Sequence, residues 1–271
     1  MNNNNIINKS FRKLNLMVSQ LGFTFCEIET LNNKIVFHKE IIFDNQNKTN
    51  TTEELFIKSL AENTIFTEQF DQINVIHDNN LSCFVPTALF DENELGSYLQ
   101  YNVKVFETDF FAVDTNQNYQ FNTVFVPYIN INNVLIDQFG SFDYQHSSSV
   151  LVSKLLGISK NIDDKKMFVH MQSNHFEIVV IQNQKLLLYN SFEYKTPEDV
   201  IYYVLFTAEQ LLLNPENFLL EFLGKIDSES TTYKMVYKYV RNVSLMDVSD
   251  LQAKNNCSEA ENREHFILFN S

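Results

Sequence analysis

GFTFCEIETLNNKIVF (residues 22–37) and SNHFEIVVIQNQKLLL (residues 173–188) share one pattern and stand far apart in the chain. Each stretch predicts a strand, a polar turn that ends in lysine, and a second strand. A helix with a clear start signal follows each stretch. Internal repeats outrank other sequence signals, because an overlooked repeat misassigns the whole fold. We therefore expect a duplicated architecture.

The two helix starts are the sharpest local signals in the chain. Thr51 with Glu54 three positions later forms a capping box, which satisfies two backbone groups reciprocally. Thr196 caps a second helix, and Pro197 occupies the first helical position, where a missing N–H is harmless. Both helices are expected to cross over the sheet that their hairpins begin.

The remaining pattern predicts two lobes of the order β-β-β-α-β-α. In the first lobe we expect strands at residues 14–19, 23–30, 35–43, 73–76, 82–85, 110–113, 119–129 and 142–145. We expect helices at 51–62, 91–99 and 132–139, and a further helix that is capped by Ser147 or Ser148 and runs to Leu156. In the second we expect strands at 167–171, 175–181, 186–190, 218–222, 243–245 and 265–269, and helices at 196–213 and 230–240.

The polar run at residues 159–166 is the expected boundary between lobes. The predicted organisation is a disordered tail at residues 1–11, an N-terminal lobe at 12–160 and a C-terminal lobe at 161–271. Hairpins followed by helical crossovers imply mixed sheets with helices on their faces. The fold class is therefore α/β, with a cleft between the two lobes.

Composition excludes some classes of partner. The chain has 271 residues, 44% hydrophobic, with 34 acidic and 20 basic side chains and a formal charge of −14. Binding to nucleic acid or to an anionic membrane surface needs clustered lysine and arginine, which this balance disfavours. Cys26, Cys83 and Cys257 have no paired spacing, which is typical of reduced thiols in a cytoplasm. We see no signal peptide and no membrane-spanning stretch, so a cytoplasmic protein is expected.

The duplicated plan resembles that of the actin-like ATPase superfamily (ribonuclease H-like lobes), which includes actin, sugar kinases and Hsp70. The chain more specifically resembles the Bacteroidetes domain-of-unknown-function family 3822. The resemblance is carried by NHFEIVVI (174–181), KLLLYNSFEYKTPED (185–199), YYVLFTAEQL (202–211), FVPTALFDE (84–92) and FDYQHSSS (142–149). It implies an actin-like fold of unassigned activity.

Active members of this superfamily carry an Asp-x-Gly type of turn in each lobe, whose carboxylate helps to hold Mg²⁺. The first turn here has Gln20 before Gly22, and the second has Gln172 before Ser173, so neither turn carries an acid. The chain has five glycines and no Gly-Gly pair for an adenosine loop. No catalytic residue is therefore predicted. If a nucleotide such as ATP binds a degenerate cleft, the resemblance points to Gly22, Thr24, Ser173 and His175. All four equally suit plain turn positions.

Three other groups of residues have alternative interpretations. His170 and His175 lack further ligands at metal-like spacing, so no metal site is predicted. His146 with the serines at 147–149 indicates either a phosphate site at a helix start or ordinary capping. An aromatic series forms either core or, in part, a partner surface: Tyr189, Phe192, Tyr194, Tyr202, Tyr203 and Phe206.

The sequence thus favours a catalytically inactive actin-like scaffold, a pseudoenzyme that acts through an unidentified protein partner and needs no cofactor. The alternative is an enzyme that binds or hydrolyses ATP through unusual residues. A self-assembling filament subunit is a third hypothesis. The oligomeric state is left open.

Overall fold

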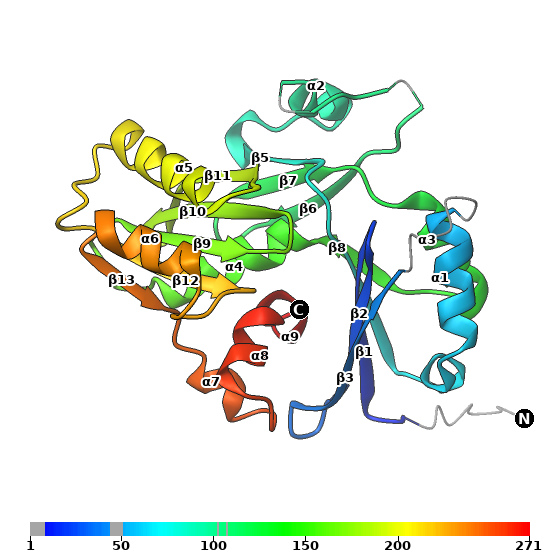
Figure 1. Cartoon of the computed structure of the whole chain (residues 1–271). Helices are drawn as coiled ribbons and strands as arrows, with labels where there is room; N and C mark the ends of the chain where they lie inside the picture. The colour runs from blue at the N-terminus through cyan, green and yellow to red at the C-terminus, as the bar shows by residue number, and fades with distance from the viewer. Residues whose placement is uncertain (1–8, 44–50, 102, 107) are drawn as a thin grey trace, which may run out of the picture.

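The computed structural model describes residues 9–43, 51–101, 103–106 and 108–271. Two five-stranded sheets dominate it (Figure 1). The first sheet consists of β1 (Arg12–Ser19), β2 (Gly22–Glu29), β3 (Lys34–Ile42), β4 (Gln72–His77) and β8 (Asp143–His146), in the order β3-β2-β1-β4-β8. The second consists of β9 (Lys166–Met171), β10 (His175–Gln182), β11 (Lys185–Glu193), β12 (Leu219–Gly224) and β13 (Asn242–Leu245), in the order β11-β10-β9-β12-β13.

The two sheets confirm the predicted duplication. In each, the first three strands form an antiparallel meander, and the fourth strand pairs in parallel with the first. The last strand pairs in parallel with the fourth. Asn33, Asn183 and Gln184 take positive φ in the two hairpin turns, a conformation that asparagine tolerates well.

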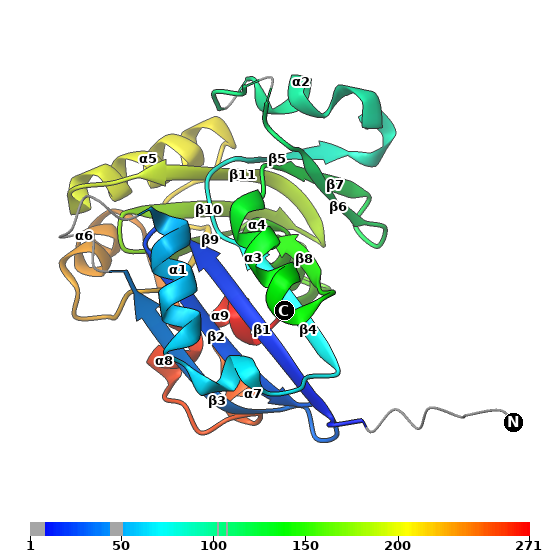
Figure 2. The same ribbon diagram turned by 90° about the vertical axis from the view of Figure 1, so that its right-hand side faces the viewer.

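A smaller third sheet is inserted in the first lobe between β4 and β8. It contains β5 (Ser82–Pro86), β6 (Ala112–Asn116) and β7 (Phe121–Phe125), in the order β5-β7-β6. The short helix α2 (Leu95–Leu99) covers it, and Leu99, Cys83, Val85 and Val124 form its small core. Figures 1 and 2 place this unit above the second sheet, with β5 beside β11.

Helices separate and cover the two large sheets. They are α1 (Thr52–Ala61), α3 (Ile129–Phe139), α4 (Ser147–Ile158), α5 (Pro197–Gln210), α6 (Thr231–Tyr239), α7 (Ser249–Gln252), α8 (Glu259–Glu264) and α9 (Phe266–Phe269), with single 3₁₀ turns at Thr64–Thr67, Thr87–Leu89 and Glu92–Glu94. In Figure 1, α1 and α3 lie outside the first sheet, and α5 and α6 lie outside the second.

Three apolar clusters follow these layers. One joins the first sheet to α1 and α3, and another joins the second sheet to α5 and α6. The third lies between the sheets, where α4 and α9 contact residues from both lobes, such as Cys26 and Phe168. The lobes therefore share a buried interior. No helix among the described residues has the length and apolar character needed to cross a bilayer.

Several predicted boundaries are wrong. Residues 266–269 form a helix and not a strand, because Phe266, Ile267, Leu268 and Phe269 are all buried between the lobes rather than on alternating faces. The chain end also returns to the first sheet, where the Asn15 side chain donates to the Leu268 carbonyl at 3.1 Å. The strand predicted at 119–129 is restricted to Phe121–Phe125, and α3 starts at Ile129. The cap of α4 is His146, not a serine.

Candidate functional site

The duplicated topology sends one side chain from each lobe toward the other lobe. Asp78 follows β4, and its N–H donates to the Val18 carbonyl at 2.8 Å. Lys225 follows β12, and its N–H donates to the Met171 carbonyl at 2.7 Å. Since β4 and β12 hold matching places in their sheets, Asp78 and Lys225 occupy equivalent positions. One is acidic and the other basic.

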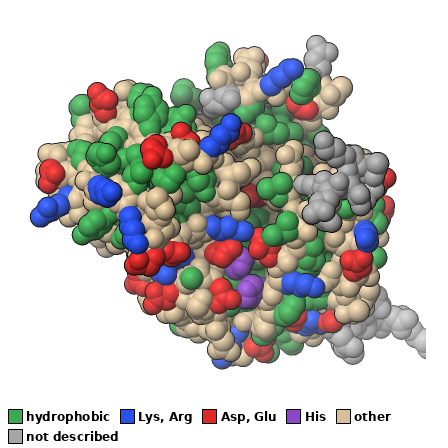
Figure 3. All heavy atoms as spheres, viewed as in Figure 1, with side chains coloured by type: hydrophobic (Ala, Val, Ile, Leu, Met, Phe, Trp, Pro, Cys, Tyr) green, Lys and Arg blue, Asp and Glu red, His purple; other side chains and the backbone are tan. Residues whose placement is uncertain are grey.

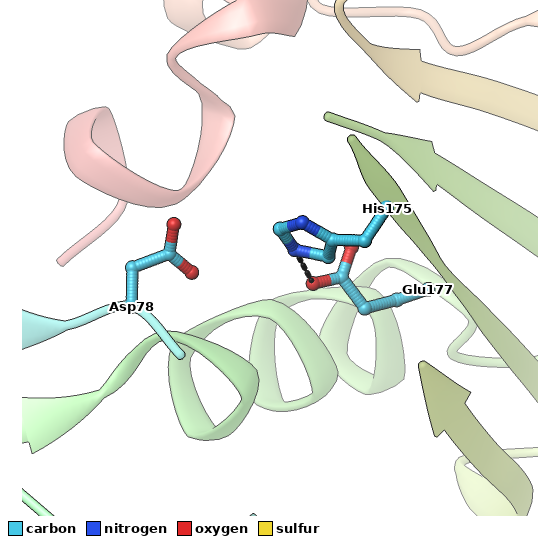
Figure 4. Close-up of side chains that lie close together, drawn as sticks. All are labelled: Asp78, His175 and Glu177. Carbon is cyan, nitrogen blue, oxygen red and sulfur yellow. Dashed lines mark ion pairs between the residues drawn. The ribbon is translucent and has the colours of Figure 1, made fainter. Parts of the chain in front are cut away.

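Asp78 faces two residues of β10 from the opposite lobe, His175 and Glu177 (Figure 4). One potential ligand atom from each of the three side chains lies within 4.8 Å of the other two. His175 Nε2 is 3.3 Å from Glu177 Oε1. Glu177 is 5% exposed and Asp78 and His175 are half-buried, so these charges meet in a largely water-excluded place.

The titration of these groups reflects their crowding. Burial, and then the charge of Glu177, raise the pKa of the Asp78 carboxyl above its ordinary value. Burial would also raise the pKa of Glu177, but His170 and His175 outweigh it and lower that pKa to about 2. Burial lowers the pKa of His175, yet the hydrogen bond and charge of Glu177 raise it overall to about 9. Glu177 is thus ionised, and His175 balances it.

Neighbouring polar groups orient both residues of β10. His170 Nδ1 lies 2.8 Å from Glu177 Oε2, and Gln172 Nε2 lies 3.3 Å from His170 Nε2. The side-chain nitrogen of Gln172 can only donate, so His170 Nε2 accepts and His170 Nδ1–H donates to Glu177. His175 Nδ1 lies 2.9 Å from the side-chain oxygen of Asn174 and donates to it. His175 Nε2 is thereby left facing Glu177.

The equivalent position in the second lobe is neutralised differently. Lys225 Nζ lies 2.9 Å from Glu40 Oε1 on β3 and 3.3 Å from Glu264 Oε1 on α8. Glu40 belongs to the first sheet, so this ion pair also joins the lobes. The Lys225 cation is therefore already paired with two carboxylates.

The four residues expected in a degenerate nucleotide cleft have mixed surroundings. Gly22 and Thr24 are buried at the start of β2, and a Cβ at Gly22 would come within 2.1 Å of the Ile41 carbonyl oxygen. Gly22 thus permits close approach of β3. Ser173 is exposed in the turn between β9 and β10, and His175 contacts Glu177. Phe23 and Met171 lie in the cores of their own lobes, so neither fills the cleft.

The His146 cluster is buried and internally bonded. Ser148 N–H donates to His146 Nδ1 at 3.1 Å, and Ser149 Oγ donates to Asp114 at 2.5 Å. Ser147, Ser148 and Ser149 are each less than 10% exposed. Burial lowers the pKa of His146 to about 3, so its ring is neutral. These contacts favour the capping interpretation over a phosphate site.

A large cavity lies between the inserted sheet and the second lobe. It has a volume of about 970 Å³ and is lined by β5, by the β6–β7 turn and by residues 184–191. Phe84 of β5 and Tyr189 of β11 meet across it, with ring centroids 4.8 Å apart. Among the described residues that line it, Lys185 is the single charged side chain. We call this cavity the β5–β11 groove.

A second surface feature lies on the outer helices. The predicted aromatic series divides, because Tyr203 stacks on Phe192 at 4.1 Å while Tyr202 and Phe206 of α5 are 60% and 46% exposed. Tyr237 of α6 is also exposed. Figure 3 shows apolar side chains gathered over this region, where Figure 1 draws α5 and α6.

Comparison with solved structures establishes the class of fold. A protein of unknown function with an actin-like ATPase fold from Bacteroides thetaiotaomicron superposes with a TM-score of 0.81 at 20% identity, covering 96% of each chain. A chain of a PilM–PilN type IV pilus biogenesis complex superposes with a TM-score of 0.54 at 12% identity, covering 95% of this chain and 96% of that one. The protein has the actin-like ATPase fold, as predicted.

The family follows from the sequence comparison. A family model described as "Protein of unknown function (DUF3822)" matches residues 1–243, and the chain belongs to this family. No curated protein matches the chain.

Proposed function

We propose that this protein is a catalytically inactive actin-like scaffold of the cytoplasm, which binds an extended segment of a partner protein in the β5–β11 groove. The observation that carries the proposal is that two strand edges, which pair with no further strand among the described residues, line one groove. β5 and β11 each stand at the end of their sheet, and the groove lies between them. The three free cysteines agree with a reducing compartment.

The register of the sheets shows which backbone groups face the groove. Tyr194 N–H donates to the Asn174 carbonyl, which fixes Phe192 and Asn190 as residues that bond to β10. Because the pattern alternates in antiparallel pairs, Tyr189 and Ser191 direct their backbone groups away from β10. A strand in the groove would accept and donate hydrogen bonds at these positions, as in other cases of strand addition.

On β5 the same reasoning applies. Thr87 N–H donates to the Gln120 carbonyl and Val126 N–H to the Leu81 carbonyl, so the alternate residues Ser82 and Phe84 face away from β7. Both walls of the groove thus present backbone donors and acceptors.

Charge indicates the nature of the partner segment. The whole chain carries −14, yet the described lining of the groove has no carboxylate and one lysine, Lys185. An acidic peptide is repelled less where no carboxylate lines the surface, and an acidic residue would pair with Lys185. We therefore expect an extended peptide with an acidic residue near one end.

The chemistry of the cleft supports a noncatalytic role. Phosphoryl transfer depends on cations placed against the phosphate oxygens. Here the Lys225 cation is already paired with Glu40 and Glu264 and is not free to contact a phosphate. The two turns that correspond to the phosphate-binding turns of active members carry no acid that could hold Mg²⁺.

One observation favours the alternative, an enzyme that binds or hydrolyses ATP. Asp78 and Glu177 bring two carboxylates into the space between the lobes from positions outside the two turns. Calorimetry with ATP and Mg²⁺ separates the two functions. The scaffold proposal predicts no heat of binding, whereas micromolar binding with phosphate release would support the enzyme.

The proposal is tested by selecting peptides from a random displayed library on the whole chain. Binding should weaken at least about tenfold in Lys185→Glu and remain unchanged in the matched control Lys195→Glu, an exposed lysine outside the groove. Methylation of alternate peptide amides should abolish binding in one register only. A failure to select any peptide, or equal effects of both variants, would refute the proposal. Concentration-dependent polymers in sedimentation would instead indicate a filament subunit.

A further inference from the structure

We propose that Asp78, His175 and Glu177 form a binding site for a divalent transition metal ion of the Zn²⁺ type, which fastens the two lobes to each other. Asp78 comes from the first lobe, and the other two ligands come from β10 of the second. This site is separate from the β5–β11 groove and does not depend on its function. Asp78 and Glu177 lie outside the two turns that carry metal-binding acids in active members of the fold, and His175 is the first residue of β10, directly after the second turn.

The spacing of the ligand atoms fits such an ion. Bonds of about 2.0–2.1 Å to nitrogen and oxygen at a tetrahedral angle place neighbouring ligand atoms about 3.3 Å apart. His175 Nε2 and Glu177 Oε1 are already 3.3 Å apart. The Asp78 carboxylate lies within 4.8 Å of both, so a small side-chain rotation brings it into range. A fourth position stays open to water or to a partner group.

The surrounding hydrogen bonds are those of a built site. A ligating imidazole usually donates its other ring N–H to a fixed acceptor, and ligating carboxylates are themselves hydrogen-bonded. His175 Nδ1–H donates to Asn174, which leaves Nε2 free to coordinate. His170 donates to Glu177 Oε2, which directs Glu177 Oε1 toward His175. Both ligands of β10 are therefore held in position.

The close approach of two carboxylates supplies a further argument. Among the described residues the Asp78 carboxylate forms no ion pair, although it faces the buried carboxylate of Glu177. Glu177 already contacts the imidazoles of His170 and His175, and Asp78 brings a second carboxylate to the same place. A divalent cation removes their repulsion, and imidazole with carboxylates suits Zn²⁺ better than Mg²⁺.

The test is calorimetric titration of the full chain with Zn²⁺, with Mg²⁺ in parallel. We expect one Zn²⁺ per chain, a rise in melting temperature with added Zn²⁺, and no heat with Mg²⁺. The variants Asp78→Asn and His175→Gln should each bind Zn²⁺ at least about tenfold more weakly, since each loses a direct ligand.

A second histidine cluster provides the matched control. His38 Nδ1 lies 3.7 Å from Cys257 Sγ, and the His38 and His265 rings are 5.1 Å apart. His38→Gln should leave Zn²⁺ binding unchanged. If His175→Gln fails to fold, Asn174→Ala, at an exposed side chain, should still weaken binding. Loss of binding in His38→Gln but not in His175→Gln, or no binding to the unaltered chain, would overturn the proposal.

Discussion

Replacement of Gly224 by alanine tests how closely the end of β12 packs against the backbone of Met171 on β9. Gly224 ends β12 with φ of +86°, and an added Cβ would come within 2.1 Å of the Met171 carbonyl oxygen. The left-handed backbone costs an alanine about 1–2 kcal/mol. The overlap requires the backbone to move, which adds roughly 1–3 kcal/mol. We expect a total loss of about 3–4 kcal/mol, equivalent to a fall in melting temperature of roughly 10 °C.

Gly140 provides a matched control, because it has φ of +81° and open space around its Cα. Gly140→Ala should therefore lose only about 1–2 kcal/mol, and the difference between the two variants isolates the contact with Met171. Gly157→Ala, within α4, should be neutral or slightly stabilising. Urea denaturation of all three variants gives the free energies of unfolding. Equal losses at Gly224 and Gly140 would refute the reasoning, because they would show that Gly224 does not pack tightly against the Met171 carbonyl of β9.

Other consequences of the structure can be checked on the same protein. His146 has its pKa lowered to about 3 by burial, so the unfolded chain takes up its proton first and stability falls with pH below about 6.5, by about 2 kcal/mol at pH 5. The neighbouring Asp114, whose pKa burial raises to about 6, acts in the opposite direction below pH 6, and the charges of His77 and Glu177 also influence His146. Urea denaturation of the unaltered protein and of His146→Asn at pH 7, 6 and 5 isolates the contribution of the histidine. Parallel dependence of the two free energies of unfolding on pH would contradict the assignment. Lys225→Met should lower the free energy of unfolding by up to about 1 kcal/mol, because Glu40 and Glu264 lose their shared partner, and added salt should shrink that difference. Tyr202→Ser, at an exposed site on α5, should change stability by less than about 0.5 kcal/mol and leave peptide binding intact; loss of peptide binding would move the partner surface from the groove to the outer helices.

The duplicated fold could be predicted because its signals are local. Alternating apolar residues, asparagine turns, the capping box at Thr51 and the cap at Thr196 are all found as expected. The C-terminal helix was not foreseen, because the run from Phe266 to Phe269 is buried on all sides by contacts with both lobes, and a short apolar run does not distinguish strand from helix.

The candidate site was harder to foresee than the fold. His175 was expected at the cleft, but Asp78 and Glu177 were not, because these residues are brought together by the packing of two lobes rather than by sequence spacing. The one available signal was the polar end of β4, where Asp78 follows a buried strand. The groove likewise depends on the inserted sheet, whose position beside β11 no local pattern encodes.

The scaffold account is tested most directly by amide hydrogen exchange of the whole chain with and without a selected acidic peptide. Exchange at the outward-facing amides of Tyr189 and Ser191 should slow when the peptide binds, while the amides of α5 and α6 stay unchanged. If the peptide slowed exchange only at the amides of α5 and α6, the partner could not bind between β5 and β11. If ATP with Mg²⁺ slowed exchange at the β9–β10 turn, the scaffold account would also be contradicted.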